Sequence, residues 1–242
     1  AWNWKAGGAT TVTNTDGYLE SEVSANTAAG FSIVSYTGDG GVGPTPNVGH
    51  GLSQVPELII VKNLDTTVDW GVFNKILGPT KAIFLNTTAG PTTSANYWAD
   101  VAPTSSLFTV GYTDTTNGVG DDMIAYCFHS VEGYSSVRVY VGNTDVDGTF
   151  VHLGFRPAFL LLRECGDVDE WGIFDDKRVG YNDDNWLLYP NEEAVESTSA
   201  TYAIDLLSNG FKLRNSDTTF NPDGHMLCLA FAESPFKYSN AR

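Results

Sequence analysis

Pro56-Glu57-Leu58-Ile59-Ile60-Val61-Lys62 returns 101 residues later, from position 56 to position 157, as Pro157-Ala158-Phe159-Leu160-Leu161-Leu162-Arg163. Each copy holds at least four consecutive apolar residues and ends on a cation. Short runs that are apolar on both faces are typical of central strands covered by a second layer. The pair therefore predicts two similar β-rich units.

Four further blocks repeat in the same order. Residues 69–74 return as 170–175 at the same offset of 101, so no insertion separates them from the first block. Residues 108–110 and 123–128 return as 211–213 and 226–231 at an offset of 103, and 36–38 return as 140–142 at an offset of 104. The offset changes only between blocks, where loops are expected. Five collinear blocks predict an internal duplication.

The composition and the spacing of apolar runs indicate an all-β fold. Glycine is abundant, with 25 residues, and aromatic residues make up 12% of the chain. We expect two tandem antiparallel β-sandwich domains, at residues 30–134 and 135–242. The expected strands are 30–37, 57–63, 69–74, 81–86, 107–112 and 122–130, then 136–141, 149–153, 158–164, 170–175, 185–189, 210–214 and 225–233. A helical turn is expected only within residues 200–208.

The first 29 residues are interpreted separately. Residues 1–6 have the same pattern as residues 125–130, the expected last strand of the first domain. Residues 1–29 are therefore expected to hold the end strand of a preceding repeat plus a linker. On this interpretation the parent protein continues upstream, and this chain is a fragment or a processed product. The alternative is that Trp2 and Trp4 belong to the first strand of the first domain.

Net charge excludes some partners. Lys and Arg number 13 against 29 Asp and Glu, a formal charge of -16 at pH 7. A basic face that neutralises phosphates is very hard to build from this composition, so nucleic acid is not an expected partner. The sequence lacks the run of about 20 apolar residues that crosses a bilayer as a helix. Membrane insertion is not expected either.

The cysteines predict buried thiols rather than disulfides. Three cysteines cannot all pair within one chain, and Cys127 and Cys228 lie inside the matching apolar strands. They differ by two positions along that strand, so both side chains should face the same way. Reduced thiols of this kind fit a protein that folds in a bacterial cytoplasm.

Catalytic motifs do not emerge from the sequence, and we expect no enzyme. The four histidines, His50, His129, His152 and His225, have no spacing that suggests metal ligation or a nucleophile relay. Paired carboxylates occur in polar loops, as at Asp183 and Asp184, where solvated charge is the favoured interpretation.

One string resembles half of a calcium loop. Asn143, Asp145 and Asp147 place oxygen ligands on alternate residues before Gly148, but Gly154 stands where a bidentate Glu is needed. The competing interpretation is an Asp-Gly hairpin turn. These three residues are the only metal candidates, and no other cofactor is expected.

Recognition, if present, is expected where the copies diverge, because loops on a rigid scaffold usually carry binding. The candidate ligand contacts are Tyr97 and Trp98 in the first copy and Tyr181, Asp183, Asp184 and Trp186 in the second. Aromatic rings beside carboxylates suit a neutral or amino sugar. The competing interpretation is that Trp98 and Trp186 cap the sandwich. Trp70 and Trp171, at equivalent positions, are interpreted as shared core residues rather than sugar platforms.

Further distinctive segments are Trp4-Lys5-Ala6-Gly7-Gly8, residues 30–38, 48–52 and 126–134, and the C-terminal residues 230–242. These segments resemble a repeat family of large virion structural proteins, including tail fibres, of marine tailed phages. The resemblance implies a structural or tail-fibre role and supplies no catalytic or ligand residues.

The resemblance implies a non-catalytic module that acts as spacer, host-surface adhesin or both. Such a module is made in the host cytoplasm and resides in the virion. Its expected partners are other virion subunits, repeats of the same parent chain or a host-surface glycan, and a homo-oligomer is compatible with this role. The alternatives are a carbohydrate-binding repeat of a secreted bacterial protein and, third, a glycan-degrading enzyme.

Overall fold

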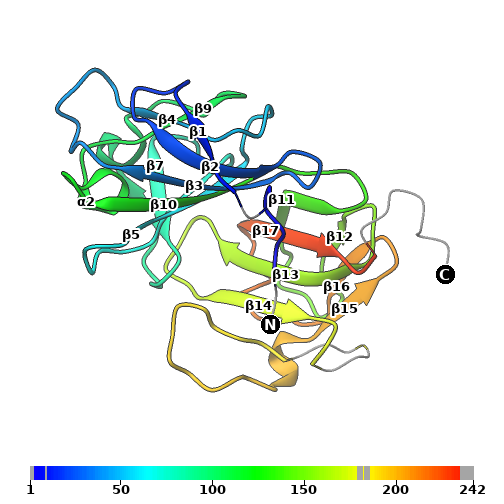
Figure 1. Ribbon diagram of the computed structural model, residues 1–242. Helices are drawn as coiled ribbons and strands as arrows, with labels where there is room; N and C mark the ends of the chain where they lie inside the picture. The colour runs from blue at the N-terminus through cyan, green and yellow to red at the C-terminus, as the bar shows by residue number, and fades with distance from the viewer. Residues whose placement is uncertain (1–2, 9, 179–181, 183–185, 235–242) are drawn as a thin grey trace. The chain divides into compact units, whose positions relative to one another are not determined.

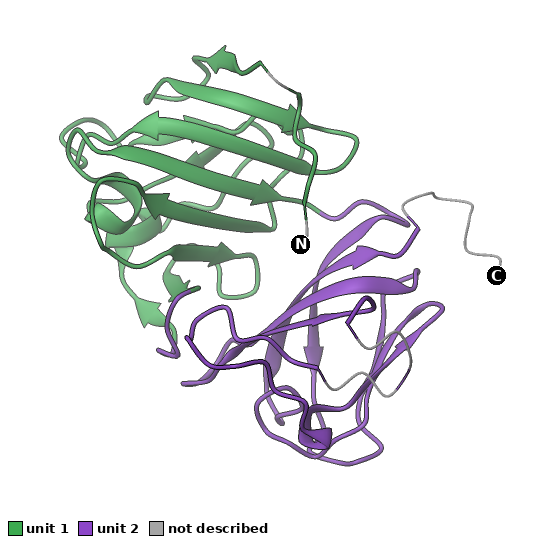
Figure 2. Cartoon of the chain, turned by 60° about the horizontal axis from the view of Figure 1, so that its bottom comes forward, with its two compact units in different colours: residues 1–85, 91–129 green, residues 86–90, 130–242 purple. Residues whose placement is uncertain are grey.

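A computed structural model describes residues 3–8, 10–178, 182 and 186–234 of the chain. These residues form an almost wholly β structure, which confirms the predicted fold class (Figure 1). The chain divides into two compact units (Figure 2). Unit 1 comprises Ala1–Leu85 and Pro91–His129, and unit 2 comprises Asn86–Gly90 and Ser130–Arg242.

Unit 1 is built on an eight-stranded antiparallel sheet. In spatial order its strands are β1 (Val12–Asn14), β2 (Ser21–Asn26), β3 (Phe31–Thr37), β10 (Asp122–Phe128), β5 (Leu58–Asn63), β6 (Gly71–Asn74), β7 (Lys81–Phe84) and β8 (Thr92–Thr93). Strands β4 (Asn47–Gly49) and β9 (Leu107–Thr109) form a second, two-stranded sheet. Two short helices, α1 (Ala95–Trp98) and α2 (Asp114–Asn117), complete the unit.

The core of unit 1 follows from strand alternation. Val23, Val34, Ala125 and Val61 are direct neighbours across β2, β3, β10 and β5, so their side chains share one face of the sheet. All four are buried in one apolar cluster, together with residues such as Phe108 of β9. This cluster lies between the layers, as expected for a β-sandwich.

Unit 2 consists of two antiparallel sheets. The larger has the order β11 (Ser135–Val141), β17 (His225–Ala232), β13 (Pro157–Glu164) and β14 (Trp171–Asp175). The smaller has the order β12 (Phe150–His152), β16 (Gly210–Leu213) and β15 (Ile204–Leu207), and a 3₁₀ turn at Ala200–Tyr202 precedes β15. Leu160 and Leu162 from the larger sheet and Phe211 from the smaller belong to one buried cluster.

The strand registers of the two units correspond. Ile60 pairs with Val72 in unit 1, and Leu161 pairs with Ile173 in unit 2, each 101 residues further along. Likewise Met123 pairs with Asn63, and Met226 pairs with Glu164. These matched registers support the proposed duplication.

The N-terminal segment differs from its prediction. Val12–Asn14 and Ser21–Asn26 are strands of the unit 1 sheet, where a linker was expected. Residues 3–6 form no strand, contrary to both interpretations of this segment. The β2 sequence, Ser-Glu-Val-Ser-Ala-Asn, has one large apolar residue, Val23. Its pairing with β3, rather than its own hydrophobicity, holds it in the sheet.

Two other boundaries also differ from the prediction. Residues 204–207 form strand β15 rather than part of a helical turn, because Ile204 and Leu206 alternate into the unit 2 core. Residues 86–90 group with unit 2 although they follow β7 in the sequence.

Among the residues that the structure describes, no helix has the length and apolar character needed to cross a bilayer.

The cysteines are as predicted. Cys127, Cys165 and Cys228 are free and buried, and Cys127 and Cys228 each lie in the core cluster of their unit. Desolvation raises the pKa of the Cys127 thiol to about 12 and that of Cys165 to about 11, and it also raises the pKa of Cys228.

Candidate functional site

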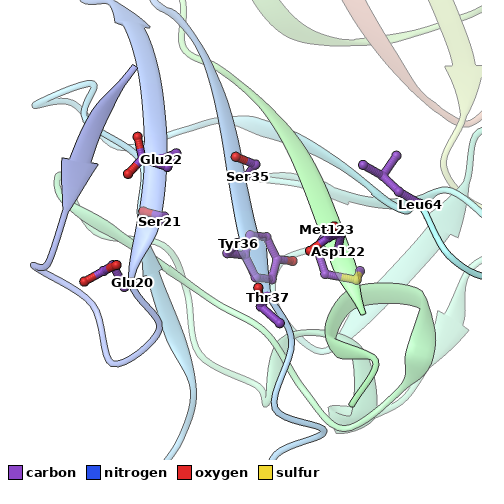
Figure 3. A pocket seen from close by; sticks show the side chains of 9 residues that line it. All are labelled: Glu20, Ser21, Glu22, Ser35, Tyr36, Thr37, Leu64, Asp122 and Met123. Carbon is purple, nitrogen blue, oxygen red and sulfur yellow. The ribbon is translucent and has the colours of Figure 1, made fainter. Parts of the chain in front are cut away.

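A groove of about 310 Å³ opens on unit 1 where β2, β3 and β10 lie side by side (Figure 3). Three carboxylates, those of Glu20, Glu22 and Asp122, line it. The other lining residues are Ser21, Ser35, Tyr36, Thr37, Leu64 and Met123. None of these nine residues is cationic.

Strand register brings the polar groups together. Glu22 pairs directly with Ser35, and Asp122 pairs directly with Thr37, so a carboxylate lies beside a hydroxyl side chain at two places in the groove. The Glu22 carboxylate accepts hydrogen bonds from the hydroxyls of Thr11 and Thr13, at 2.6 and 2.5 Å. These two bonds lower the pKa of Glu22, so its carboxylate is ionised at neutral pH.

The groove can therefore accept hydrogen bonds from an amine or from hydroxyl groups, and its charge repels anions. It has no histidine, and its hydroxyl side chains stand beside no base other than carboxylates. This arrangement suits a neutral or cationic ligand better than an anionic one.

A buried asparagine locks the loops beside this groove. Asn117 at the end of α2 is fully buried; its Oδ1 accepts from the Asp39 amide, and its Nδ2 donates to the Gly111 carbonyl and to Asp39 Oδ1. The Tyr36 hydroxyl donates to the neighbouring Thr116 carbonyl at 2.7 Å. We call the side chains of Asn117 and Tyr36 the loop lock of unit 1.

Unit 2 has the same lock 104 residues further along. Asn221 accepts from the Asn143 amide at 2.9 Å and donates to the Asn215 carbonyl at 2.7 Å. The Tyr140 hydroxyl donates to the Phe220 carbonyl at 2.7 Å. Sequence reasoning missed both locks, although Tyr36 and Tyr140 open the repeated blocks and Asn117 and Asn221 keep the same 104-residue offset.

The ligand prediction at Trp98 is wrong. Its side chain is 1% exposed and packs edge to face against Phe73 in the unit 1 core, so no sugar can stack on it. The Ser94 hydroxyl caps α1, and Ala99 ends it in the left-handed conformation, which fixes the turn that carries Trp98. This burial fits the competing interpretation, in which Trp98 caps the β-sandwich.

The other predicted ligand contacts are not brought together. Tyr97 is half-buried with its ring edge against Phe84, and burial raises its pKa. Trp186 is half-buried in unit 2. Tyr181, Asp183 and Asp184 lie outside the described residues. Tyr97 and Trp186 stay candidate contacts in separate units.

The paired tryptophans differ in environment. Trp171 is fully buried, with the Arg163 guanidinium 5.9 Å from its ring centroid. Trp70, its predicted equivalent, is half-buried, so the core interpretation holds fully only for Trp171. Arg163 is itself buried, and its Nη2 donates to the carbonyls of Thr88 and Ala89.

The predicted calcium ligands have other partners. Asn143 Oδ1 accepts from the amide of Asp145 and from Asn221, and Asp145 Oδ1 accepts from the amide of Asp147. Asp147 also forms an ion pair with Lys212 at 2.8 Å. Within the described residues, no group of three or more His, Cys, Asp or Glu side chains could hold a metal ion. These contacts favour the turn interpretation.

Comparison with known protein families places residues 1–235 in a single match to a domain of unknown function, DUF7483. The chain belongs to this family. The DUF7483 match includes residues of both units. No curated protein and no solved structure matches the chain.

Proposed function

We propose that this chain is a non-catalytic structural module of a phage virion, part of a tail fibre that acts as spacer, host-surface adhesin or both. The observation that carries the proposal is the recurrence of one loop lock, Tyr36 with Asn117 and Tyr140 with Asn221, in two serial β-sandwich units. Serial repetition of one rigid unit is how a chain spans distance without a single large core.

The internal chemistry of each unit suits this role. Buried asparagines that satisfy loop amides and carbonyls fix the loops without disulfides or metals. The three buried free thiols fit assembly in a host cytoplasm, where disulfides are rare. The sequence resemblance to virion repeat proteins supports a virion as the particle in which such a module resides.

We propose other virion subunits, repeats of the parent chain or host glycans as partners. The net charge of -16 favours uncharged over acidic glycans. Nucleic acid and anionic lipid are disfavoured by the same charge.

Mass spectrometry of purified virions tests the proposal. Peptides of this chain are expected in particles banded on a density gradient, in amounts that survive high-salt washing. Their presence only in the medium of uninfected bacteria would overturn the virion assignment and favour a secreted carbohydrate-binding protein. Loss of polysaccharide viscosity on incubation with the purified chain would instead assign it as a glycan-degrading enzyme.

A further inference from the structure

Four exposed apolar side chains gather around the loop that joins β3 to β4 in unit 1. Tyr18 is 52% exposed, Val42 85%, Tyr112 53% and Val119 72%. An added Cβ would lie 2.2 Å from Val119 at Gly40, 1.9 Å from the Tyr112 ring at Gly41 and 2.3 Å from the Tyr18 hydroxyl at Gly43. The loop backbone therefore contacts three of the four. We call these four residues the tip patch.

The glycines are what let the rings approach the loop. Gly40 and Gly41 have φ angles of +67° and +77°, which residues with a Cβ rarely adopt. With no side chain at Gly41, the Tyr112 ring rests against the backbone. About half of each tyrosine side chain remains in solvent, so one side of the ring is available to a ligand.

The loop around the rings is held in place before any ligand binds. Asp39 Oδ1 accepts from the Gly41 amide at 2.7 Å, and the amide of Tyr112 donates to the Asn96 carbonyl at 2.8 Å. The amide of Tyr18 donates to Asn47 Oδ1 at 2.7 Å. A backbone fixed in this way loses little conformational entropy on binding.

The polar groups nearby favour an uncharged or amine-bearing ligand. Asp39 belongs to the loop, and its Oδ2 is buried without a hydrogen-bond donor among the described residues. Thr37, which lines the groove, directly precedes the loop at Gly38, so the groove lies at the base of the loop. Hydroxyl or amine donors of a ligand that reached the groove would meet carboxylates there, whereas an acidic ligand would be repelled.

Unit 2 keeps only part of the tip patch. At the offset of 104 that relates the loop locks, Val146 corresponds to Val42 and is also exposed, whereas Ser216 replaces Tyr112 and Asp223 replaces Val119. The corresponding loop is instead tied down by the ion pair between Asp147 and Lys212. Because unit 2 does without an aromatic residue at the position of Tyr112, the Tyr112 ring points to a role outside folding.

We infer that the tip patch binds a neutral or amino sugar, whose apolar face stacks on Tyr112 and Tyr18 while its hydroxyl groups extend toward the groove at the base of the loop. Tyrosine suits this task because its ring is apolar and its hydroxyl is polar. The inference deepens the adhesin part of the proposed function and rests on it. It places recognition at residues that the sequence did not single out.

A glycan array probed with the full chain tests the inference. The array carries neutral glycans, N-acetylated amino-sugar glycans and acidic glycans. Binding to at least one neutral or amino-sugar glycan is expected. Tyr112→Ala and Tyr18→Ala should each weaken it by about 3- to 10-fold, the range for loss of one aromatic stacking contact. Tyr112→Phe should retain most of the affinity.

Two further variants separate binding from folding. Val42→Lys changes a side chain that is 85% exposed, so it should leave the unfolding midpoint unchanged, and it should weaken binding because it replaces an apolar contact and repels an amine. Phe150→Ala removes an aromatic ring of unit 2 that is 41% exposed, and it should bind like the parent chain. The Val42 variant and the Phe150→Ala control still test the inference if Tyr112→Ala fails to fold.

Three results would overturn the inference: no binding to any neutral or amino-sugar glycan, binding unaffected by the patch variants, or a preference for acidic glycans. Self-association that requires Tyr112, seen by analytical ultracentrifugation, would assign the tip patch to a second copy of the chain instead. None of these results bears on whether the chain resides in the virion, so failure here leaves the structural role intact.

Discussion

Asn117 Oδ1 accepts a hydrogen bond from the amide of Asp39 at 2.8 Å, so two loops 78 residues apart in the sequence are joined by one buried side chain. Asn221 makes the same contact with Asn143, also 78 residues away. A buried amide that satisfies several backbone groups costs stability when removed, because those groups stay buried without partners.

Asn117→Ala should therefore destabilise unit 1 by about 2–3 kcal/mol, since it leaves the amide of Asp39 and the carbonyl of Gly111 unpaired. Urea unfolding followed by tryptophan fluorescence measures the change. Thr67→Ala, at an exposed position of the same unit, serves as the control and should change little. Equal midpoints for the two variants would show that the lock does not stabilise the fold.

Arg163 should be required for the local structure around residues 86–90. Its buried Nη2 donates to the carbonyls of Thr88, Ala89 and Asp167, and the Asp169 amide donates to Thr88. Arg163→Met leaves those carbonyls without this donor and should cost about 2–4 kcal/mol.

Lys62, at the equivalent position of unit 1, donates instead to carbonyls within its own loop, those of Asn63, Thr66 and Val68. Arg163→Lys should therefore keep part of the stability but lose contacts to residues 86–90, because an ammonium lacks the reach of the guanidinium fork. Hydrogen exchange at the Asp169 amide reports this loss. Unchanged exchange in both variants would contradict the assigned role.

The buried thiols predict a specific pH response. Burial raises the pKa of Cys127 to about 12 from its ordinary value of 9.0, so the folded state retains a proton that the unfolded state releases. This contribution to stability is complete below pH 9 and is lost as the pH rises towards 12. We expect the unfolding midpoint to fall over that range, and Cys127→Ala should reduce the fall.

Thiol titration with Ellman's reagent at pH 8 checks the same burial. No thiol should react in the native protein, and three should react after unfolding in guanidinium. Rapid reaction of Cys127 or Cys228 before unfolding would show that the β10 or β17 strand is open.

Calcium removal distinguishes a metal loop from a turn at residues 143–148. If the contacts of Asn143, Asp145 and Asp147 form a metal-free turn, then EGTA should leave the thermal midpoint unchanged. A midpoint that falls with EGTA, is restored by Ca²⁺ and loses this response in Asp145→Ala would establish the calcium site.

The central strands could be predicted from the sequence because their apolar runs are uninterrupted. Runs such as 58–61 and 159–162 are apolar throughout, and five spaced blocks align the copies. The strand β2 escaped prediction because it has one large apolar residue, Val23, and is held by its neighbour β3. Local pattern cannot show pairing between distant segments.

The candidate site was harder to predict for a similar reason. Trp98 lies in a polar, divergent loop, yet the capped turn of α1 directs it into the core. Tyr18 and Tyr112 lie 94 residues apart and gather only because the glycine-rich loop passes between them. An aromatic residue in a loop can be core or surface, and only the fold decides which.

Immunogold electron microscopy of intact virions, with an antibody raised against the purified chain, tests whether the chain belongs to the tail fibre. We expect gold particles along or at the ends of the tail fibres, and the same antibody should label particles from which the genome has been released. Absence of label from particles that bind a control antibody to the capsid, or label confined to the bacterial surface, would contradict it.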